Sequence, residues 1–361
     1  MLKIKVLIVD DSIFMRKLIS DFVSKDDRLQ VVGTAKNGLE AIKLTGELKP
    51  DVITMDVEMP EMDGLTALRH IMHKFPTPVL MVSSLTEKGA FETIKALQLG
   101  AVDFIQKPSG SVSLDLFRVR EELLAKIKAV SKARLSKTVE PVSKETVQTI
   151  ARPVIPRAVK PQTVKKGFEQ LFAIGTSTGG PKALETVITG LPDDFNNPVL
   201  VVQHMPPKFT EYLAKRLDGI SKVNVVEAQN NQVISGGTVY IAPGDYHMEV
   251  RQRGTEYRIS LTKEPQRNGH RPSVDVLYDS VSKLTRLKRH YIIMTGMGGD
   301  GAAGMQKAKE GGAATTTIAE SEETCIVYGM PKTAVNLGCV DHVLPLQRIS
   351  SKIIELSQKT R

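Results

Sequence analysis

Short apolar runs alternate with segments of helical periodicity through the first 130 residues of the chain. A continuous apolar run is typical of a strand buried on both faces, as in a parallel sheet covered by helices. The last helical segment spans about residues 114–130. The pattern predicts an N-terminal domain over residues 1–130. This domain is expected to have a doubly wound, flavodoxin-like α/β fold with five parallel strands, at residues 6–9, 31–32, 52–55, 79–82 and 102–105.

The same rhythm resumes after Gly167. Apolar runs predict further strands of a mostly parallel sheet at residues 171–174, 199–203, 223–228, 239–242 and 291–295. Apolar and polar positions alternate over residues 248–261 on either side of Arg253-Gly254, which indicates an antiparallel hairpin. We expect a second domain over residues 167–361, α/β and hydrolase-like, that includes this hairpin.

Residues 131–166 separate the two predicted domains as a basic linker. Between residues 135 and 166 the chain has four prolines and no glycine or aromatic residue, and such a stretch buries too little apolar surface to fold alone. Residues 132–166 carry nine basic residues against two acidic ones, a net +7 that makes up most of the formal net charge of +9. Because no aromatic residues are interleaved, this charge favours solubility over nucleic-acid binding.

The chain length, the cysteines and the apolar runs indicate the number of domains and the cellular compartment. A length of 361 residues fits two domains. Cys325 and Cys339 are too few and wrongly spaced for a disulfide framework or a four-ligand zinc site, which favours a reducing compartment. The N-terminus lacks the features of a signal peptide, and no apolar run is long enough to span a bilayer. We expect a cytoplasmic monomer without direct membrane insertion.

Acidic residues follow the strands predicted for the first domain. Asp10 and Asp11 follow the first strand, Asp56 the third, Ser83 the fourth and Lys107 the fifth. Because ligands of parallel sheets collect at the carboxyl ends of the strands, one crevice receives all five side chains. Three carboxylates repel one another unless a cation binds, and a set of oxygen ligands suits Mg²⁺. A carboxylate at the centre of the sheet, Asp56, is then placed to attack a phosphoryl donor.

Each of these residues alone has a simpler interpretation, with Asp10 and Asp11 capping a helix at Ser12 and Asp56 ending a strand. Together, with Pro108 after Lys107, they make residues 1–125 resemble the receiver domain of two-component response regulators. The resemblance implies that a histidine kinase phosphorylates Asp56 and that Ser83 and Lys107 support the reaction. It also implies that Mg²⁺ is bound by Asp10, Asp11, Asp56 and the backbone carbonyl of Glu58.

A serine occupies a turn between strand and helix early in the second domain. Ser177 is followed by Gly179 and Gly180, and Pro181 can begin the next helix. At such a turn a serine is held exposed, near backbone N–H groups and a helix N-terminus, as a nucleophile requires. A phosphate-binding turn explains the same glycines, and this segment alone does not decide between the two.

Two further strand ends favour the nucleophile. His204 ends the strand at residues 199–203, and Asp300 follows the strand at residues 291–295, so parallel strands bring both to the rim that carries Ser177. A serine hydroxyl needs a neighbouring base, and the base needs a carboxylate to orient it. Taken singly, His204 could be structural and Asp300 a helix cap before Ala302, and His270 is the main competitor as the base.

Residues 168–357 resemble the catalytic domain of the protein-glutamate methylesterases of bacterial chemotaxis, the CheB family. The resemblance implies hydrolysis of glutamate methyl esters, and deamidation of selected glutamines, on methylated chemoreceptors after phosphorylation of the receiver. Ser177 would attack, His204 would act as base, Asp300 would orient it, and backbone N–H groups near Thr178 and Met297 would form the oxyanion hole, with no cofactor. The matching segments begin at Gly175, Gln203, Tyr240, His270, Thr295 and Tyr328.

Two positions depart from the common pattern of that family: Thr176 stands where alanine is usual, and Gly299 where asparagine is usual. The alternative class is a non-enzymatic response regulator whose second domain binds an anionic ligand or nucleic acid. The chain end lacks a helix-turn-helix pattern, and the basic excess lies in the linker, so the sequence favours the enzyme.

Overall fold

The computed structural model describes residues 2–84, 86–107, 113–133, 167–312 and 315–358, without the side chains of residues 113–118. The predicted linker falls outside these residues from position 134 onward, as does Pro108. In the part of the chain that the structure describes, no helix is long and apolar enough to cross a membrane.

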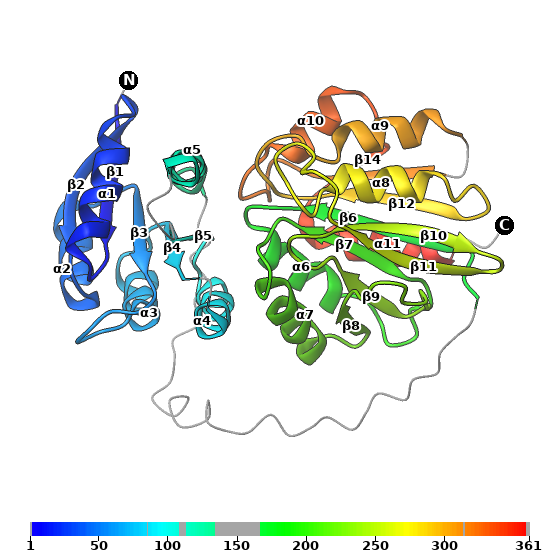
Figure 1. Ribbon diagram of the computed structural model, residues 1–361, viewed down its shortest axis with the longest axis horizontal. Coiled ribbons are helices and arrows are strands. Elements are labelled where there is room, and N and C mark those ends of the chain that lie inside the picture. The colour runs from blue at the N-terminus through cyan, green and yellow to red at the C-terminus, as the bar shows by residue number, and fades with distance from the viewer. Residues whose placement is uncertain (1, 85, 108–112, 134–166, 313–314, 359–361) are drawn as a thin grey trace.

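The first unit is a five-stranded parallel sheet in the order β2-β1-β3-β4-β5, with helices on both faces (Figure 1). This confirms the predicted doubly wound fold. The apolar runs become β1, β3 and β4, which are almost wholly buried. The elements are β1 (Ile4–Val9), α1 (Ile13–Ser24), β2 (Leu29–Ala35), α2 (Gly38–Leu48), β3 (Val52–Asp56), α3 (Gly64–Lys74), β4 (Val79–Ser83), α4 (Glu87–Gln98), β5 (Asp103–Gln106) and α5 (Ser113–Val130).

The second unit is built on a seven-stranded parallel sheet in the order β14-β13-β12-β6-β7-β9-β8, and the predicted hairpin forms a separate antiparallel pair, β10 and β11. The predicted mostly parallel α/β fold is confirmed. The elements are β6 (Gln170–Thr176), α6 (Gly180–Thr189), β7 (Val199–Gln203), α7 (Phe209–Ile220), β8 (Asn224–Glu227), β9 (Thr238–Ile241), β10 (His247–Arg253), β11 (Glu256–Thr262), α8 (Val274–Ser282), β12 (Lys288–Ile293), α9 (Ala302–Glu310), β13 (Thr315–Glu320), α10 (Met330–Asn336), β14 (His342–Leu344) and α11 (Leu346–Gln358).

The apolar pattern missed β13 and β14. β13 begins with three threonines, and β14 has three residues at the edge of the sheet, none of them fully buried. Neither strand offers a run of apolar residues. Both are held in place by pairing with a neighbouring strand that is already part of the sheet, which is information that a local pattern does not contain.

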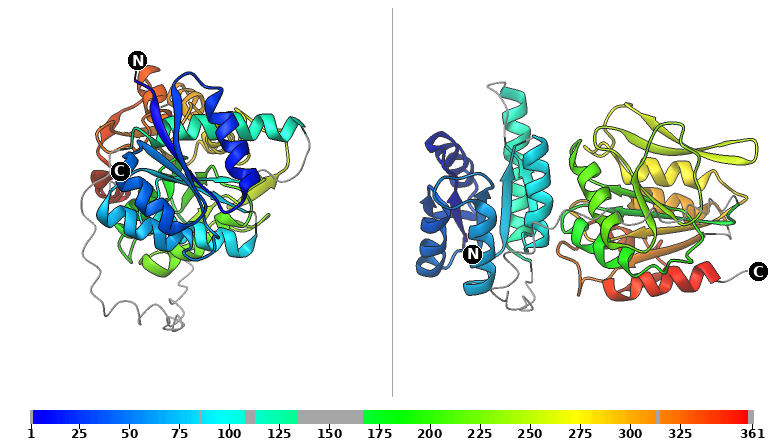
Figure 2. Two further views of the ribbon diagram at one scale, coloured as in Figure 1. Left: turned by 90° about the vertical axis from the view of Figure 1, so that its left-hand side faces the viewer. Right: turned by 90° about the horizontal axis from the view of Figure 1, so that it is seen from below.

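The two units lie side by side, with α4 and α5 on the side of the first unit that faces the second (Figures 1 and 2). Phe104 of β5 stacks on Phe209 of α7, with ring centroids 4.6 Å apart and planes 5° from parallel. Phe91 of α4 meets Tyr212 of α7 edge to face. The Phe104–Phe209 pair is buried, whereas Phe91 is more than half exposed, and a buried aromatic pair stabilises a contact beyond the area that it buries. The apolar core of the first unit therefore continues into that of the second at this point.

Replacing Phe104 by alanine should loosen the contact between the two units. The substitution removes the ring that stacks on Phe209, and a buried aromatic pair contributes about 0.5–1.5 kcal/mol in addition to its buried area. Small-angle scattering of the full chain should then show a larger radius of gyration. Phe14→Ala is the control, because Phe14 is 71% exposed on α1. Identical scattering from Phe104→Ala and wild type would contradict the expectation.

Candidate active site and phosphoacceptor site

The turn that carries Ser177 depends on its glycines. Gly179 has a φ of 80°, and α6 begins directly after it without a side-chain cap. A Cβ atom at Gly180 would lie 2.0 Å from the Gln203 side chain. The Ser177 N–H donates to the Thr295 carbonyl at 3.0 Å, which ties the turn to the loop after β12. Ser177 is thus held half-buried, beside helix N–H groups that no preceding side chain occupies.

His204 and Asp300 meet as the strand order requires. The Nε2 atom of His204, at the end of β7, lies 2.8 Å from Oδ2 of Asp300. Since an ionised carboxylate only accepts hydrogen bonds, Nε2 carries a proton, and in the neutral imidazole the lone pair is then on Nδ1. The Nδ1 atom is buried and has no hydrogen-bond partner among the described residues.

Asp300 is a buried carboxylate satisfied by many donors. Its oxygens accept from the Val274 N–H at 2.7 Å, the Ser273 hydroxyl at 2.8 Å and the Asn268 side-chain amide at 3.0 Å. Burial works against its charge, but the hydrogen bonds from His204, Asn268 and Val274 hold the pKa of Asp300 well below its ordinary value. Asp300 thus stays ionised at the N-terminus of α8, where the helix dipole favours a negative charge.

Two alternatives for these residues can be compared with the geometry. Asp300 does not cap α9, because the N-cap of that helix is Gly301 and no side chain caps it. The Asp300 carboxylate instead accepts a hydrogen bond from the Val274 N–H, at the N-terminus of α8. The histidine that meets Asp300 is His204. His270 lies face to face with it, the ring centroids 3.7 Å apart and the planes within 9°. His270, the alternative candidate for the base, thus packs against the face of the His204 ring.

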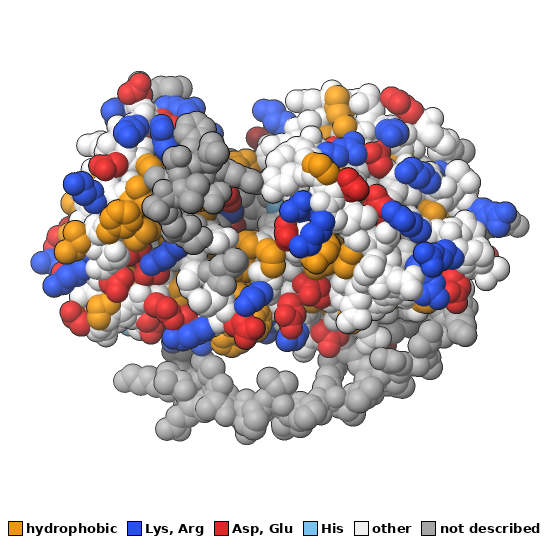
Figure 3. Space-filling view, in the orientation of Figure 1, with side chains coloured by type: hydrophobic (Ala, Val, Ile, Leu, Met, Phe, Trp, Pro, Cys, Tyr) orange, Lys and Arg blue, Asp and Glu red, His pale blue; other side chains and the backbone are white. Residues whose placement is uncertain are grey.

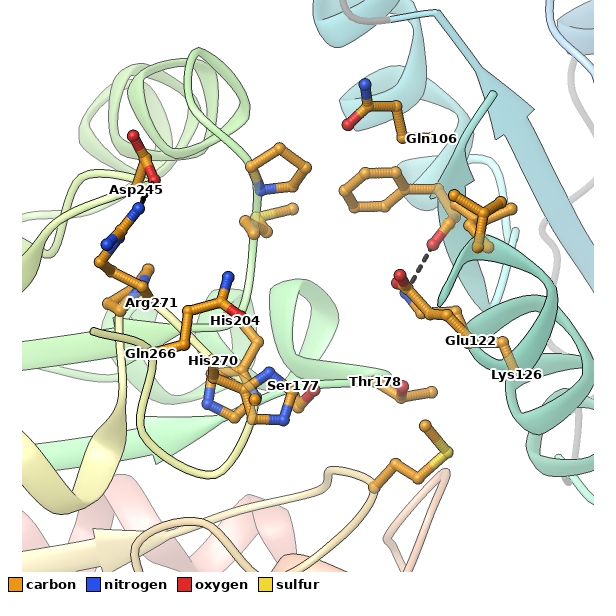
Figure 4. A pocket seen from close by; sticks show the side chains of 18 of the residues that line it. Gln106, Glu122, Lys126, Ser177, Thr178, His204, Asp245, Gln266, His270 and Arg271 are labelled. Carbon is orange, nitrogen blue, oxygen red and sulfur yellow. Dashed lines mark hydrogen bonds and ion pairs between the residues drawn. The ribbon is translucent and has the colours of Figure 1, made fainter. Parts of the chain in front are cut away.

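Ser177 and His204 line the same cavity, of about 650 Å³, at the boundary of the two units (Figure 4). No hydrogen bond joins their side chains among the described residues, although such bonds are often long in free enzymes and tighten with substrate. Thr178 and Met297, the expected oxyanion residues, line the cavity too. The surface is hollowed where the two units meet (Figure 3). The catalytic roles of these residues stay predictions.

The first unit forms the opposite wall of this cavity, with residues that include Phe104, Gln106, Glu122 and Lys126 (Figure 4). The Thr178 hydroxyl donates to Oδ2 of Asp103 at 2.8 Å, and Lys126 lies 3.0 Å from the same oxygen. Burial disfavours the charge of Lys126, but the Asp103 and Glu122 carboxylates hold its pKa above the ordinary value. The residue next to Ser177 is thus bonded to the first unit.

The two departures from the family pattern have structural roles. The Thr176 hydroxyl donates to the Thr295 carbonyl at 2.9 Å, so it reinforces the contact between the Ser177 turn and the loop after β12. At Gly299 a Cβ atom would lie 3.0 Å from the Thr333 side chain. The glycine therefore accommodates a threonine of α10, and both departures are compatible with the loops as they stand.

The acidic crevice forms at the carboxyl edge of the first sheet. Carboxylate oxygens of Asp10, Asp11 and Asp56 lie within 4.8 Å of one another, and Lys107 lies 2.8 Å from Asp56 and 3.1 Å from Asp10. Burial raises the pKa of Asp56 to about 6, against the opposing effect of Lys107. A compact set of carboxylate oxygens is the donor chemistry that fits Mg²⁺. Ser12, not an aspartate, caps α1.

Ser83 lies at the end of β4 as predicted, but its hydroxyl is turned away from the crevice. It donates to the Gly89 carbonyl at 3.2 Å and accepts from Thr93 at 2.8 Å, both in α4. Ser84 lines the crevice instead. In this arrangement the Ser83 hydroxyl is bonded to two partners in α4, and its expected support of the phosphoryl group stays a prediction.

Reasoning from the sequence missed several residues that the structure brings to the active site. Asn268 binds Asp300, and Asp103 binds Thr178. Asn268 had a signal, since an Asn-Gly pair predicts a tight turn beside His270. The sequence around Asp103 contained no such signal, because its partner, Thr178, lies in the other unit.

Comparisons with known proteins identify both domains. The family model of the CheB methylesterase matches residues 172–353, and that of the response regulator receiver domain matches residues 6–116. Proteins named protein-glutamate methylesterase/protein-glutamine glutaminase are 49% identical over 353 residues in Geobacillus kaustophilus, covering 98% of each chain, and 46% identical over 361 residues in Bacillus subtilis, covering 99% of each. The crystal structure of the Thermotoga maritima CheB methylesterase catalytic domain is 43% identical, has a TM-score of 0.51 and covers 53% of this chain and 100% of that chain.

A receiver domain joined to a methylesterase domain defines a response regulator whose output is an enzyme. The matches extend over nearly the whole chain at substantial identity. The chain belongs to the protein-glutamate methylesterase/protein-glutamine glutaminase family and is a carboxylic ester hydrolase.

Mg²⁺ binding to the acidic crevice should weaken as the pH falls through about 6. Protons compete with the cation for Asp56, so a pKa of about 6 predicts a Kd about tenfold higher at pH 5 than at pH 7. Calorimetric titration with MgCl₂ measures this dependence. Asp51→Asn, at an exposed carboxylate outside the crevice, should behave like wild type. A Kd that stays constant across this range would contradict the expectation.

Proposed function

We propose that this protein hydrolyses glutamate methyl esters on the cytoplasmic part of chemoreceptors by a Ser-His-Asp mechanism, and that phosphorylation of Asp56 activates it. The observation that supports the mechanism best is the 2.8 Å contact of His204 with Asp300, made by a histidine that lines the same cavity as Ser177 and whose Nδ1 atom has no hydrogen-bond partner among the described residues. The family that the chain belongs to carries this reaction in its name.

In the proposed reaction, the Ser177 hydroxyl attacks the ester carbonyl while Nδ1 of His204 takes the proton. Asp300 stabilises the imidazolium that forms and fixes its orientation. The negative oxygen of the tetrahedral intermediate accepts hydrogen bonds from backbone N–H groups near Thr178 and Met297. His204 then protonates the departing methoxide, methanol leaves, and water hydrolyses the acyl-enzyme with His204 again as base.

The same machinery accounts for deamidation of selected glutamines. An amide passes through the same kind of tetrahedral intermediate as an ester, and ammonia leaves in place of methanol. His204 is more important in that case, because an amine leaves only after it has been protonated. Both reactions leave a glutamate on the receptor. Because they pass through the same kind of intermediate, we propose that they use the same residues of the site.

Regulation is proposed to act through the wall that the first unit contributes to the cavity. Helix α4 carries the partners of Ser83 and also packs against α7 of the second unit. Strand β5 carries Asp103 and Phe104 at the contact, and Lys107 at the crevice follows it. A phosphoryl group on Asp56 that draws Ser83 and Lys107 towards itself would therefore disturb both contacts and shift the population towards an open arrangement.

Mg²⁺ would be held by Asp10, Asp11, Asp56 and the Glu58 carbonyl, and when bound it neutralises charge on the transferring phosphoryl oxygens. The chain's own residues supply the rest: Asp56 is the acceptor, and Lys107 is the nearby cation. The phosphodonor is proposed to be a histidine kinase, the substrate a methylated chemoreceptor and the enzyme a monomer. Ester hydrolysis itself is proposed to need no cofactor.

Replacing Ser177 by alanine should lower methanol release from methylated receptor membranes at least about 10³-fold, because the acyl-enzyme cannot form. Release of labelled methanol measures this directly. Ser235→Ala is the matched control, because this partly buried serine precedes β9 and does not line the cavity. Full activity in Ser177→Ala would overturn the proposed mechanism, and would favour the anion-binding interpretation of the turn.

Acetyl phosphate with Mg²⁺ should raise the rate of methanol release by the wild type, and Asp56→Asn should not respond, because an amide cannot form the acyl phosphate. Asp51→Asn retains the buried acceptor and should respond like wild type. If the wild type released methanol at one rate with and without acetyl phosphate, although Asp56 was phosphorylated, the regulatory part of the proposal would fail while the hydrolase could stand.

A further inference from the structure

A tight turn outside the proposed triad touches two of its members. Residues Arg267 and His270 exchange backbone hydrogen bonds of 3.1 Å and 3.0 Å. Between them, Asn268 and Gly269 have φ values of 55° and 80°. Two consecutive left-handed residues are the geometry of the hairpin turn that Asn-Gly favours. The local sequence therefore fixes the conformation of this turn, and with it the direction of both flanking side chains.

The Asn268 amide lies between two buried carboxylates. Its Nδ2 atom donates to Oδ1 of Asp300 at 3.0 Å and to Oδ2 of Asp275 at 2.8 Å. Both aspartates are 2% exposed. An amide nitrogen has two hydrogens, so each hydrogen serves one carboxylate. A neutral group with two donors thus lies between two carboxylates, and it offsets the effect by which the charge of Asp300 raises the pKa of Asp275.

The turn is anchored on one side and reaches the triad on the other. Arg267 forms an ion pair of 2.6 Å with Asp279 of α8. His270, at the far end of the turn, stacks on His204. The turn therefore spans from α8 to the imidazole, and Asn268 contacts Asp300 in between. A single four-residue element contacts both residues that must be oriented for proton transfer.

We propose that Asn268 is a positioning residue for ester hydrolysis, which holds the Asp300 carboxylate so that Oδ2 faces Nε2 of His204. The proposal rests on the proposed Ser-His-Asp mechanism. The Oδ1 atom takes Asn268 and Ser273, and this leaves Oδ2 for His204 and the Val274 N–H. The left-handed backbone of the turn needs only a residue such as glycine, so the turn itself does not require the amide.

This distinction permits a substitution that separates the two roles. Asn268→Gly removes the amide and keeps a residue that adopts positive φ without strain. The matched control is Asn231→Gly, because Asn231 also has a positive φ, of 64°, in a turn away from the cavity. Steady-state methanol release from methylated receptor membranes by the full chain gives kcat and KM for each variant, and thermal unfolding reports on folding.

We expect Asn268→Gly to lower kcat about 10- to 100-fold with little change in KM, as the loss of one hydrogen bond to a charged group implies. Asn231→Gly should retain the wild-type kcat. With one donor fewer, Asp300 stabilises the His204 imidazolium more strongly, so the acid limb of the kcat profile should move to higher pH. Asn268→Asp, which adds a third carboxylate to the pair Asp300 and Asp275, should move the acid limb further towards high pH. The other charged or titratable groups around the pair, Asp275, Arg267 and His270, are the same in all variants.

A wild-type kcat and pH profile in Asn268→Gly would overturn the proposal. An equal loss of kcat in Asn231→Gly would also overturn it. So would a loss of kcat in Asn268→Gly without a shift of the acid limb, because either result indicates a merely structural role. Ser177→Ala distinguishes this failure from that of the mechanism on which it rests. If Ser177→Ala is inactive and Asn268→Gly is unaffected, the triad stands and the positioning role alone is lost.

Discussion

The second unit depends on one buried negative charge, that of Asp300. A carboxylate that is 2% exposed is strongly disfavoured unless donors surround it. The donors come from the N-terminus of α8 and the neighbouring turn at Asn268, and from the ring of His204, which lies far from both in the sequence. Satisfying this charge therefore brings together the loops that form the cavity. The stability of the site and its chemistry rest on the same contacts.

The turn at Ser177 serves both units. On one side it is bonded to the loop after β12, through the Ser177 N–H and the Thr176 hydroxyl. On the other side, Thr178 donates to Asp103 of the first unit. Adjacent residues thus connect to the loop after β12 and to the first unit. In the proposed regulation, a displacement of β5 would reach the residue next to Ser177 through the hydrogen bond between Asp103 and Thr178, without a long chain of intermediates.

The sequence predicts those parts of the structure that local patterns encode. Continuous apolar runs predict the central strands, and strand ends predict where Asp56, His204 and Asp300 lie. The threonine-rich β13 and the short β14 escape this reasoning because pairing with neighbours, not hydrophobicity, defines them. The contact between Thr178 and Asp103 escapes it as well, because it depends on how the two units pack against each other. Ser83 shows the limit within one domain, since its position was predictable and its rotamer was not.

The orientation of His204 illustrates the same limit at the level of single atoms. Spacing along the chain predicts that this imidazole reaches a carboxylate, but either ring nitrogen could make that contact. In the structure, Nε2 contacts Asp300, and Nδ1 has no hydrogen-bond partner among the described residues. Either nitrogen can act as the base, provided that the other is fixed by a hydrogen bond. Catalysis therefore requires that His204 keep one tautomer. Asp300 fixes that tautomer, and the donors around Asp300, including the neutral Asn268 amide, hold the carboxylate in place.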